Sequence, residues 1–174
     1  LINNDCKTTK NNIFYSHNWS IKHTKDIDYS LIPKILNETN TIADYYEKEK
    51  FIDTLDVPIS GLHNISNLIA AIAACRLKKV NYLEIKKNIK YLSLPKRRFE
   101  FKGEFKNRKI IDDYAHHPTE IKASIELGKL YIKGKKNSCE RLVVIFQPHR
   151  YSRVAKFLDD FVEVLIKADS IIIT

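Results

Sequence analysis

Apolar residues recur at helical spacing through residues 61–79, which read GLHNISNLIAAIAACRLKK. This spacing puts an apolar stripe along one side of a helix and predicts an α-helix over the segment. Gly61 is expected to break the strand before it, and Asn64 or Ser66 to cap the helix. Cys75 falls inside the apolar run, so we expect a buried thiol there.

A second, shorter helix is predicted for residues 81–94, NYLEIKKNIKYLSL, with Asn81 as its cap. Pro95 follows directly and is expected to end it, because the residue before a proline is disfavoured in the helical region. The sequence pattern changes after this proline. We therefore place a domain boundary near Pro95.

The first 58 residues have the aromatic and β-branched composition of strands, joined by segments rich in Asn and Lys. Strand-like stretches are NNIFYSHN (11–18) and KEKFIDTLDVPIS (48–60). A hairpin is expected to turn at Glu47–Lys50. The N-terminal part of the chain is thus predicted to be a sheet that leads into two helices.

From residue 96 onward, short apolar runs alternate with amphipathic segments. Strands are predicted for residues 97–105, 108–115, 141–148 and 169–174, and helices for residues 118–133 and 152–168, with Pro118 in the first turn of one helix and Ser152 as the cap of the other. The continuous apolar run RLVVIFQP is typical of a buried parallel strand. Strand, helix, strand, helix, strand is the order of a doubly wound, Rossmann-like sheet, so the predicted fold class is α/β.

The net charge of the chain restricts its possible functions less than the predicted fold does. The 174 residues include 30 Lys and Arg against 21 Asp and Glu, which gives a formal net charge of +9. Such an excess attracts anions, nucleic acid among them. Aromatic residues do not interleave with the basic ones in an RNA-binding pattern, so a solvated basic surface is the preferred interpretation. A basic nucleic-acid-binding module and a noncatalytic α/β interaction domain remain as alternatives.

The cysteines indicate the cellular compartment of the protein, and the two ends of the chain indicate whether the sequence is a fragment. Cys6, Cys75 and Cys139 lie far apart and form no C-x-x-C pair, which fits a reducing cytoplasm. No apolar run approaches the roughly 18 residues of a membrane span, and no signal peptide is visible. The chain starts at Leu1 and stops within the strand-like ADSIIIT. We therefore expect a fragment of a longer protein.

Two of the predicted parallel strands end in dense polar chemistry, DDYAHHP (112–118) and QPHRYSR (147–153). Ligands of an open parallel sheet collect at the carboxyl ends of its strands, so both clusters are expected at one edge. His149, Arg150 and Arg153 surround a helix N-terminus, where cations are tolerated when an anion is bound. Arginine grips a carboxylate through two hydrogen bonds, which indicates an acidic ligand group. The alternative is ion pairing with Asp159 or Asp160, which is worth little at a surface.

The first cluster could bind a metal or orient a substrate. The H-H-P spacing does not match a helical zinc site and no cysteine is near, so no metal site is predicted. A substrate-orienting role suits the mixture of Asp112, Asp113, Tyr114, His116 and His117 better, since it combines acceptors, a hydroxyl and groups that titrate near neutral pH. The alternative is that the aspartates pair with the arginines of KRRFEF and that His117 only precedes a helix cap.

Two further clusters contain candidate binding groups. Asn64 and Asn67 are three positions apart at a helix start, and an asparagine amide can read an adenine edge. Two ordinary helix caps are the alternative, favoured by spacing alone. Arg97 and Arg98 follow Pro95 at the proposed junction and could reach a phosphate. The alternative for this pair is a solvated basic turn.

Four motifs in this order, GLHNISN, RRFEFKGEF, DDYAHHPTEI and FQPHRYSR, resemble those of the Mur ligases. The resemblance covers about residues 58–174, and residues 1–57 match only loosely. DDYAHHP alone would also fit the family member that recycles murein tripeptide, whereas QPHRYSR favours the alanine-adding branch. The resemblance implies a partial central ATPase domain in residues 1–94, followed by a partial doubly wound C-terminal domain in residues 95–174.

The family's chemistry, as the resemblance implies it, is ATP-dependent joining of an amino acid to a UDP-muramoyl carboxylate through an acyl phosphate, in the cytoplasmic synthesis of peptidoglycan. The implied substrates are UDP-N-acetylmuramate and L-alanine, with neither nucleic acid nor membrane as a partner. ATP and Mg²⁺ are the implied cofactors. No G-x-x-x-x-G-K-[ST] occurs, and NDCKTT (4–9) lacks the loop glycines, so the phosphate cradle and the Mg²⁺ ligands are expected outside this chain. The fragment by itself is expected to be inactive.

Roles carried over from the resemblance fall on ten residues. Arg98 resembles an arginine near the nucleotide phosphates, and Asp113 the acidic residue that faces it; both are catalytic candidates. The adenine side is expected at His63, Asn64 and Asn67, and the amino-acid pocket at Tyr114 and His116 with a carboxylate-binding group at His149, Arg150 and Arg153.

Overall fold

The computed structural model describes residues 2–3, 17–22, 24–133 and 140–174. Cys6, Cys139, the NDCKTT segment and most of the strand predicted at 11–18 lie outside the described residues. The chain divides into two compact units, residues 1–93 and residues 94–174. No helix in the described ranges combines the length and the apolar composition that a membrane crossing requires.

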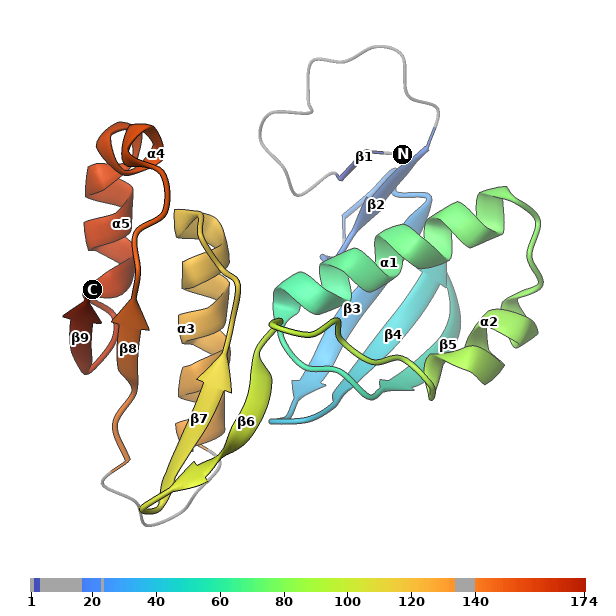
Figure 1. Ribbon diagram of the computed structural model, residues 1–174. Helices are drawn as coiled ribbons and strands as arrows, with labels where there is room; N and C mark the ends of the chain where they lie inside the picture. The colour runs from blue at the N-terminus through green and yellow to red at the C-terminus, as the bar shows by residue number, and fades with distance from the viewer. Residues whose placement is uncertain (1, 4–16, 23, 134–139) are drawn as a thin grey trace. The chain divides into compact units, whose positions relative to one another are not determined.

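The first unit is a five-stranded sheet with two helices (Figure 1). The strands are β1 (Ile2–Asn3), β2 (Asn18–Ser20), β3 (Tyr29–Leu36), β4 (Thr41–Glu47) and β5 (Lys50–Val57), and they lie side by side in this order. The β1–β2 and β2–β3 pairs are parallel, whereas β3–β4 and β4–β5 are antiparallel. Helix α1 (Leu62–Leu77) packs on β2 and β3 through its apolar stripe, with Ile65, Ile69 and Ile72 almost fully buried.

The hairpin predicted at Glu47–Lys50 is confirmed, because these two residues pair across β4 and β5. Lys48 and Glu49 form the turn with φ of 47° and 66°. Positive φ at both central residues is the geometry of the two-residue hairpin turn that matches the twist of its strands.

Helix α1 begins differently from the prediction. Its N-cap is Gly61, with φ of 95°, and neither Asn64 nor Ser66 caps it. Glycine takes this conformation without the clash that a Cβ would cause. The Asn64 side chain turns back instead, and its Nδ2 donates to the Ser60 carbonyl at 2.6 Å. The prediction of a buried Cys75 thiol is also wrong, since Cys75 is exposed.

Helix α2 (Tyr82–Ile89) is capped by Asn81 as predicted, with the side chain accepting from the Leu83 N–H. It ends at Ile89, well before Pro95. Tyr82 stacks on Tyr45 of β4 with ring centroids 5.4 Å apart. The Tyr82 hydroxyl donates to Asp53 of β5 at 2.8 Å, so aromatic stacking and a hydrogen bond together hold α2 against the sheet.

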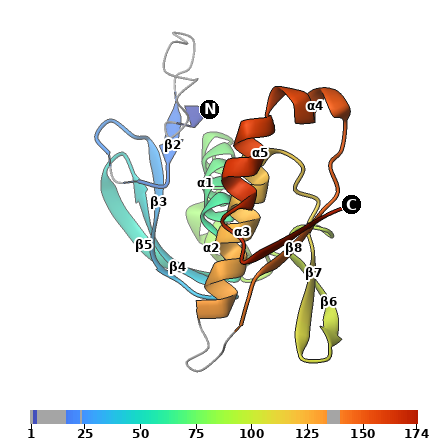
Figure 2. The same ribbon diagram turned by 90° about the vertical axis from the view of Figure 1, so that its left-hand side faces the viewer.

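The second unit contains two separate pairs of strands. Its elements are β6 (Glu100–Phe105), β7 (Arg108–Asp112), α3 (Pro118–Lys133), β8 (Val143–Phe146), α4 (Tyr151–Lys156), α5 (Leu158–Leu165) and β9 (Ser170–Ile173). Strands β8 and β9 are parallel, and β6 and β7 form an antiparallel hairpin. Helices α3 and α5 pack side by side (Figure 2). Side chains of these two helices and of β8 form the core of the unit, which consists of Ile121, Ile125, Phe146, Phe161, Val164 and Leu165.

The α/β fold class is confirmed, and the element order of the second unit is the predicted one. Three details differ. The helix predicted for residues 152–168 is broken at Phe157 into α4 and α5. Arg150, with φ of 67°, stands at the N-cap of α4 in place of Ser152. In β8 only Phe146 is buried, while Val143 and Ile145 are exposed, so this apolar strand is not covered on both faces in the described residues.

Candidate functional site

The loop after β7 meets α4, the first helix after β8, within the second unit. Arg153 Nη1 donates to the main-chain oxygen of His116 at 3.4 Å, a contact between residues 37 positions apart. The imidazole of His117 packs edge-on against the Phe157 ring, with centroids 4.9 Å apart. The two polar clusters found in the sequence therefore lie at one place, although β7 pairs with β6 and not with β8.

The N-terminus of α3 organises the first loop. His117 precedes Pro118, and its carbonyl accepts from the Ile121 N–H, which makes it the N-cap residue. Its Nδ1 lies 2.9 Å from the Thr119 hydroxyl. The alternative interpretation placed His117 just before a helix cap. In the structure His117 lies one position further along, at the N-cap itself.

Glu120 is the centre of this loop. Its Oε2 accepts from the N–H groups of His116 at 3.0 Å and His117 at 3.2 Å. The reach of a glutamate at the third helical position back to the N-cap amide is half of a capping box. On the opposite side, Arg98 Nη1 lies 3.8 Å from Glu120 Oε1. Burial raises the pKa of Glu120, but the two amide hydrogen bonds and the charges of His116 and Arg98 outweigh it and lower the pKa below its ordinary value.

Asp113 is engaged by groups of its own unit. Its carboxylate accepts from the Phe99 N–H at 3.1 Å, the Ala115 N–H at 2.8 Å and the Ser124 hydroxyl at 2.9 Å. We expected Asp113 to face Arg98, whereas the carboxylate that pairs with Arg98 in the described residues is that of Glu120. Asp113 instead ties the loop after Pro95 to the loop after β7.

The alternative of an ion pair holds for the neighbouring residues. Arg97 Nε lies 3.3 Å from Asp112 Oδ2, and the two side chains are 55% and 33% exposed. The Arg97 guanidinium also lies over the Tyr114 ring, 4.9 Å from its centroid. Tyr114 is half exposed, and its ring meets His116 edge-on at 5.1 Å. Tyr114 and His116 thus lie in contact with each other in this loop.

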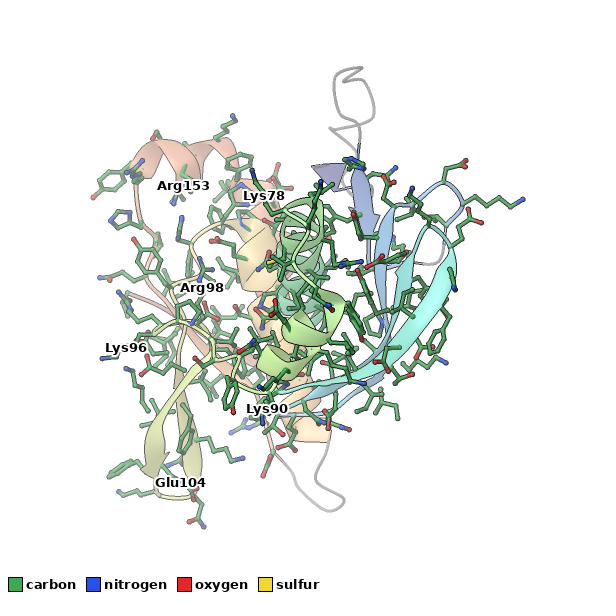
Figure 3. All side chains as sticks on the ribbon, turned by 90° about the vertical axis from the view of Figure 1, so that its right-hand side faces the viewer. Lys78, Lys90, Lys96, Arg98, Glu104 and Arg153 are labelled. Carbon is green, nitrogen blue, oxygen red and sulfur yellow. The ribbon has the colours of Figure 1, made fainter. Side chains whose placement is uncertain are left out.

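His149 and Arg150 are exposed at the start of α4, and Arg153 is partly buried. Among the described side chains, neither arginine forms an ion pair with Asp159 or Asp160, so that alternative is wrong here. Arg98 and Arg153 are labelled in Figure 3, where both belong to the second unit. Arginine side chains left without a carboxylate partner are suited to bind one from a ligand.

The nucleotide-side candidates lie in the first unit at the start of α1. Asn64 is buried and bonded to Ser60, whereas Asn67 is exposed. A Cβ on Gly61 would lie 2.9 Å from Cε1 of His63, so this imidazole covers the helix N-terminus. Of the two asparagines, Asn67 is the one whose amide is accessible to a ligand. The two asparagines thus differ in burial, although they are only three positions apart.

Sequence reasoning did not single out Glu120 or Ser124 as site residues. The signal for Glu120 was present, because a Glu two positions after a proline at the start of a predicted helix stands where the glutamate of a capping box does. Nothing in the sequence marks Ser124 as a partner of Asp113. Within the described residues, no group of three or more His, Cys, Asp or Glu side chains is arranged to hold a metal ion.

Comparison with known proteins agrees with the geometry. Residues 97–174 match the family model described as Mur ligase, glutamate ligase domain. The chain is 56% identical to a UDP-N-acetylmuramate–L-alanine ligase of Prochlorococcus marinus subsp. pastoris, with 100% of this chain and 38% of that protein aligned. It is 48% identical to the protein of the same name from Prochlorococcus marinus strain NATL1A, over 100% of this chain and 36% of that protein.

A solved structure gives the same result. The UDP-N-acetylmuramate–alanine ligase of Thermotoga maritima superposes with a TM-score of 0.72 at 26% identity, over 91% of this chain and 34% of that one. The chain thus spans little more than a third of the length of the curated relatives it matches. The family model, the identity to these relatives and the shared fold all lead to one conclusion: this chain belongs to the Mur ligase family.

Proposed function

We propose that this chain is part of an ATP-dependent ligase that joins L-alanine to UDP-N-acetylmuramate in cytoplasmic peptidoglycan synthesis. The observation that carries the proposal is the contact between the polar loop after β7 and helix α4, made by His116 and Arg153. This contact joins the loop that carries Tyr114 and His116 to the partly buried Arg153, and this combination supports a site for a small zwitterion. The names of the aligned relatives support the choice of alanine.

The reaction class needs positioning and charge stabilisation more than a protein nucleophile. Arg150 and Arg153 hold the alanine carboxylate, which leaves the amine free to attack the activated muramoyl carboxylate. Tyr114 and His116 line the pocket for the alanine methyl group. Arg98 offsets negative charge on the phosphoryl group, and Asp113 fixes the loop that carries Arg98 through the Phe99 N–H.

ATP, when bound, supplies the phosphoryl group that activates the carboxylate. In this chain His63 and Asn67 are suited to the adenine side, and Asn64 supports them through its bond to Ser60. Mg²⁺ is assigned to residues outside this chain, as is the phosphate cradle. We further propose that residues 1–94 belong to the central ATP-binding domain and residues 95–174 to the amino-acid-binding domain.

The test is a kinetic comparison in the complete protein that carries this chain. Formation of UDP-N-acetylmuramoyl-alanine is followed by mass spectrometry with L-alanine and, separately, with murein tripeptide as the acceptor. Arg150→Ala is expected to raise the KM for L-alanine far more than the KM for ATP. Arg108→Ala, at the exposed end of the β6–β7 hairpin, is the matched control and should change neither.

Equal effects of Arg150→Ala on both substrates would reject the assignment, and preference for the tripeptide would point to the recycling branch of the family. The 174-residue chain alone should not hydrolyse ATP. A filter-binding assay over a salt series tests the nucleic-acid alternative, because phosphate-driven binding weakens steeply as salt rises.

A further inference from the structure

Glu120 lies between two arginines that the proposed function assigns to different substrates. Its Oε1 faces Arg98 at 3.8 Å, on the phosphoryl side. Its Oε2 binds the His116 and His117 amides, and His116 Nδ1 is 3.5 Å from the same oxygen. The carbonyl of His116 in turn accepts from Arg153, on the amino-acid side.

These contacts form one continuous path of polar groups, from Arg98 through Glu120 to Arg153. The path runs through the peptide group between His116 and His117, whose N–H binds Glu120 and whose carbonyl binds Arg153. Each link is a hydrogen bond or an ion pair, and the path crosses from the loop after Pro95 to helix α4. The Glu120 side chain is 34% exposed, so its carboxylate is only partly screened by water. A shift of the His116 peptide therefore moves the acceptor that holds Arg153.

We infer that Glu120 is a positioning residue that sets Arg98 and Arg153 relative to each other, and so aligns the phosphoryl and amino-acid sites. This inference rests on the proposed function. Glu120 touches no reacting atom; it acts by ordering the His116 peptide and by restraining Arg98. The lowered pKa of Glu120 agrees with a carboxylate that stays charged in this environment.

Three variants separate the two parts of this role. Glu120→Gln keeps an oxygen that can accept from the two amides but removes the charge that faces Arg98. Glu120→Ala removes both. Glu126→Gln is the control, because Glu126 is exposed on the same helix α3 and its loss changes the net charge by the same amount.

In the complete protein, we expect Glu120→Gln to lower kcat about tenfold with little change in the KM for L-alanine, since a displaced charge slows the chemical step. Glu120→Ala should in addition raise the KM for L-alanine about tenfold or more, because Arg153 loses its fixed acceptor. Glu126→Gln should match the parent protein. Equal kinetics for Glu120→Gln and Glu120→Ala, or no effect of either, would overturn the inference.

A second measurement does not depend on activity. In the 174-residue chain, the Nε–H NMR signal of Arg153 is compared between the parent, Glu120→Ala and Glu126→Gln. We expect a shift of this signal and faster amide exchange at His116 in Glu120→Ala alone, with unchanged far-UV circular dichroism. If the parent protein makes no alanyl product, the proposed function is wrong, while an unmoved Arg153 signal refutes the positioning role by itself.

Discussion

Arg153 Nη1 lies 3.4 Å from the main-chain oxygen of His116, and this hydrogen bond joins helix α4 to the loop after β7. The bond leaves the remaining guanidinium donors of Arg153 available for a ligand, because arginine has five N–H groups. An arginine whose guanidinium is fixed by one hydrogen bond to the main chain, and whose other N–H groups can still donate, is pre-oriented to bind a carboxylate. The amino-acid site that we propose depends on this arrangement.

Arg153→Met should weaken amino-acid binding by removing both the anchor and the ligand donors. In the complete protein we expect the KM for L-alanine to rise about tenfold or more, the loss of a charge-assisted bidentate contact, with the KM for ATP unchanged. Lys156→Met removes the same charge from the same short helix at an exposed position and should have little effect. Similar kinetics for the two variants would contradict the assignment of Arg153.

Asp113→Asn should destabilise the second unit, because the Phe99 and Ala115 N–H groups bind different oxygens of the carboxylate and the amide that replaces it keeps only one acceptor oxygen. We expect a loss of about 1–3 kcal/mol in the free energy of unfolding, measured by amide exchange at Phe99 and Ala115. Asp112→Asn breaks only the accessible pair with Arg97 and should cost about 0–1 kcal/mol. The prediction fails if the two variants are equally stable.

Acid should destabilise the first unit through Asp44. This buried carboxylate lies 2.6 Å from Lys34 Nζ and 2.7 Å from the Thr54 hydroxyl. The hydrogen bond from Lys34 lowers the pKa of Asp44 most, burial opposes it, and Thr54 adds to the lowering, so the pKa in the folded chain is below the ordinary 3.8. A carboxyl group whose pKa is lower in the folded chain than in the unfolded chain stabilises the fold at pH values above its unfolded-state pKa. This stabilisation is lost as the pH falls through its folded-state pKa.

Trp19, the single tryptophan, lies in the first unit, and its fluorescence reports the unfolding of that unit in urea. We expect the midpoint to be steady between pH 7 and about pH 5 and to fall below about pH 4. Asp44→Asn should lower the midpoint at pH 7 and flatten its fall with acid, whereas Asp56→Asn, at an exposed position of β5, should leave the fall unchanged. An unaltered pH profile in Asp44→Asn would show that other groups govern the acid response.

Asn81→Ala should loosen the start of α2, because the Leu83 N–H loses its acceptor. The expected cost is about 1 kcal/mol, read from the same urea transition. Asn81→Asp retains a capping oxygen and should restore most of the stability. Asn88→Ala, on the exposed side of α2, serves as the control and is expected to stay within about 0.5 kcal/mol of the parent.

Local pattern predicted much of this protein from its sequence. The apolar stripe of α1, the Asn81 cap, the turn at Lys48 and Glu49 and the alternation of elements after Pro95 all follow from spacing and turn chemistry. Such features depend on residues that are close together in the sequence, so the sequence alone is sufficient to predict them. The four motifs also led to the family in the same way.

Packing decided the rest. The exposure of Cys75, the break of the last helix at Phe157 and the choice of Glu120 over Asp113 as the partner of Arg98 depend on which surfaces meet in three dimensions. The contact between His116 and Arg153 spans 37 residues, and no periodicity records it. The sequence alone thus determined the elements and their chemistry, while only the tertiary structure decided which polar groups face each other, because hydrogen-bond partners are fixed by how the loops pack.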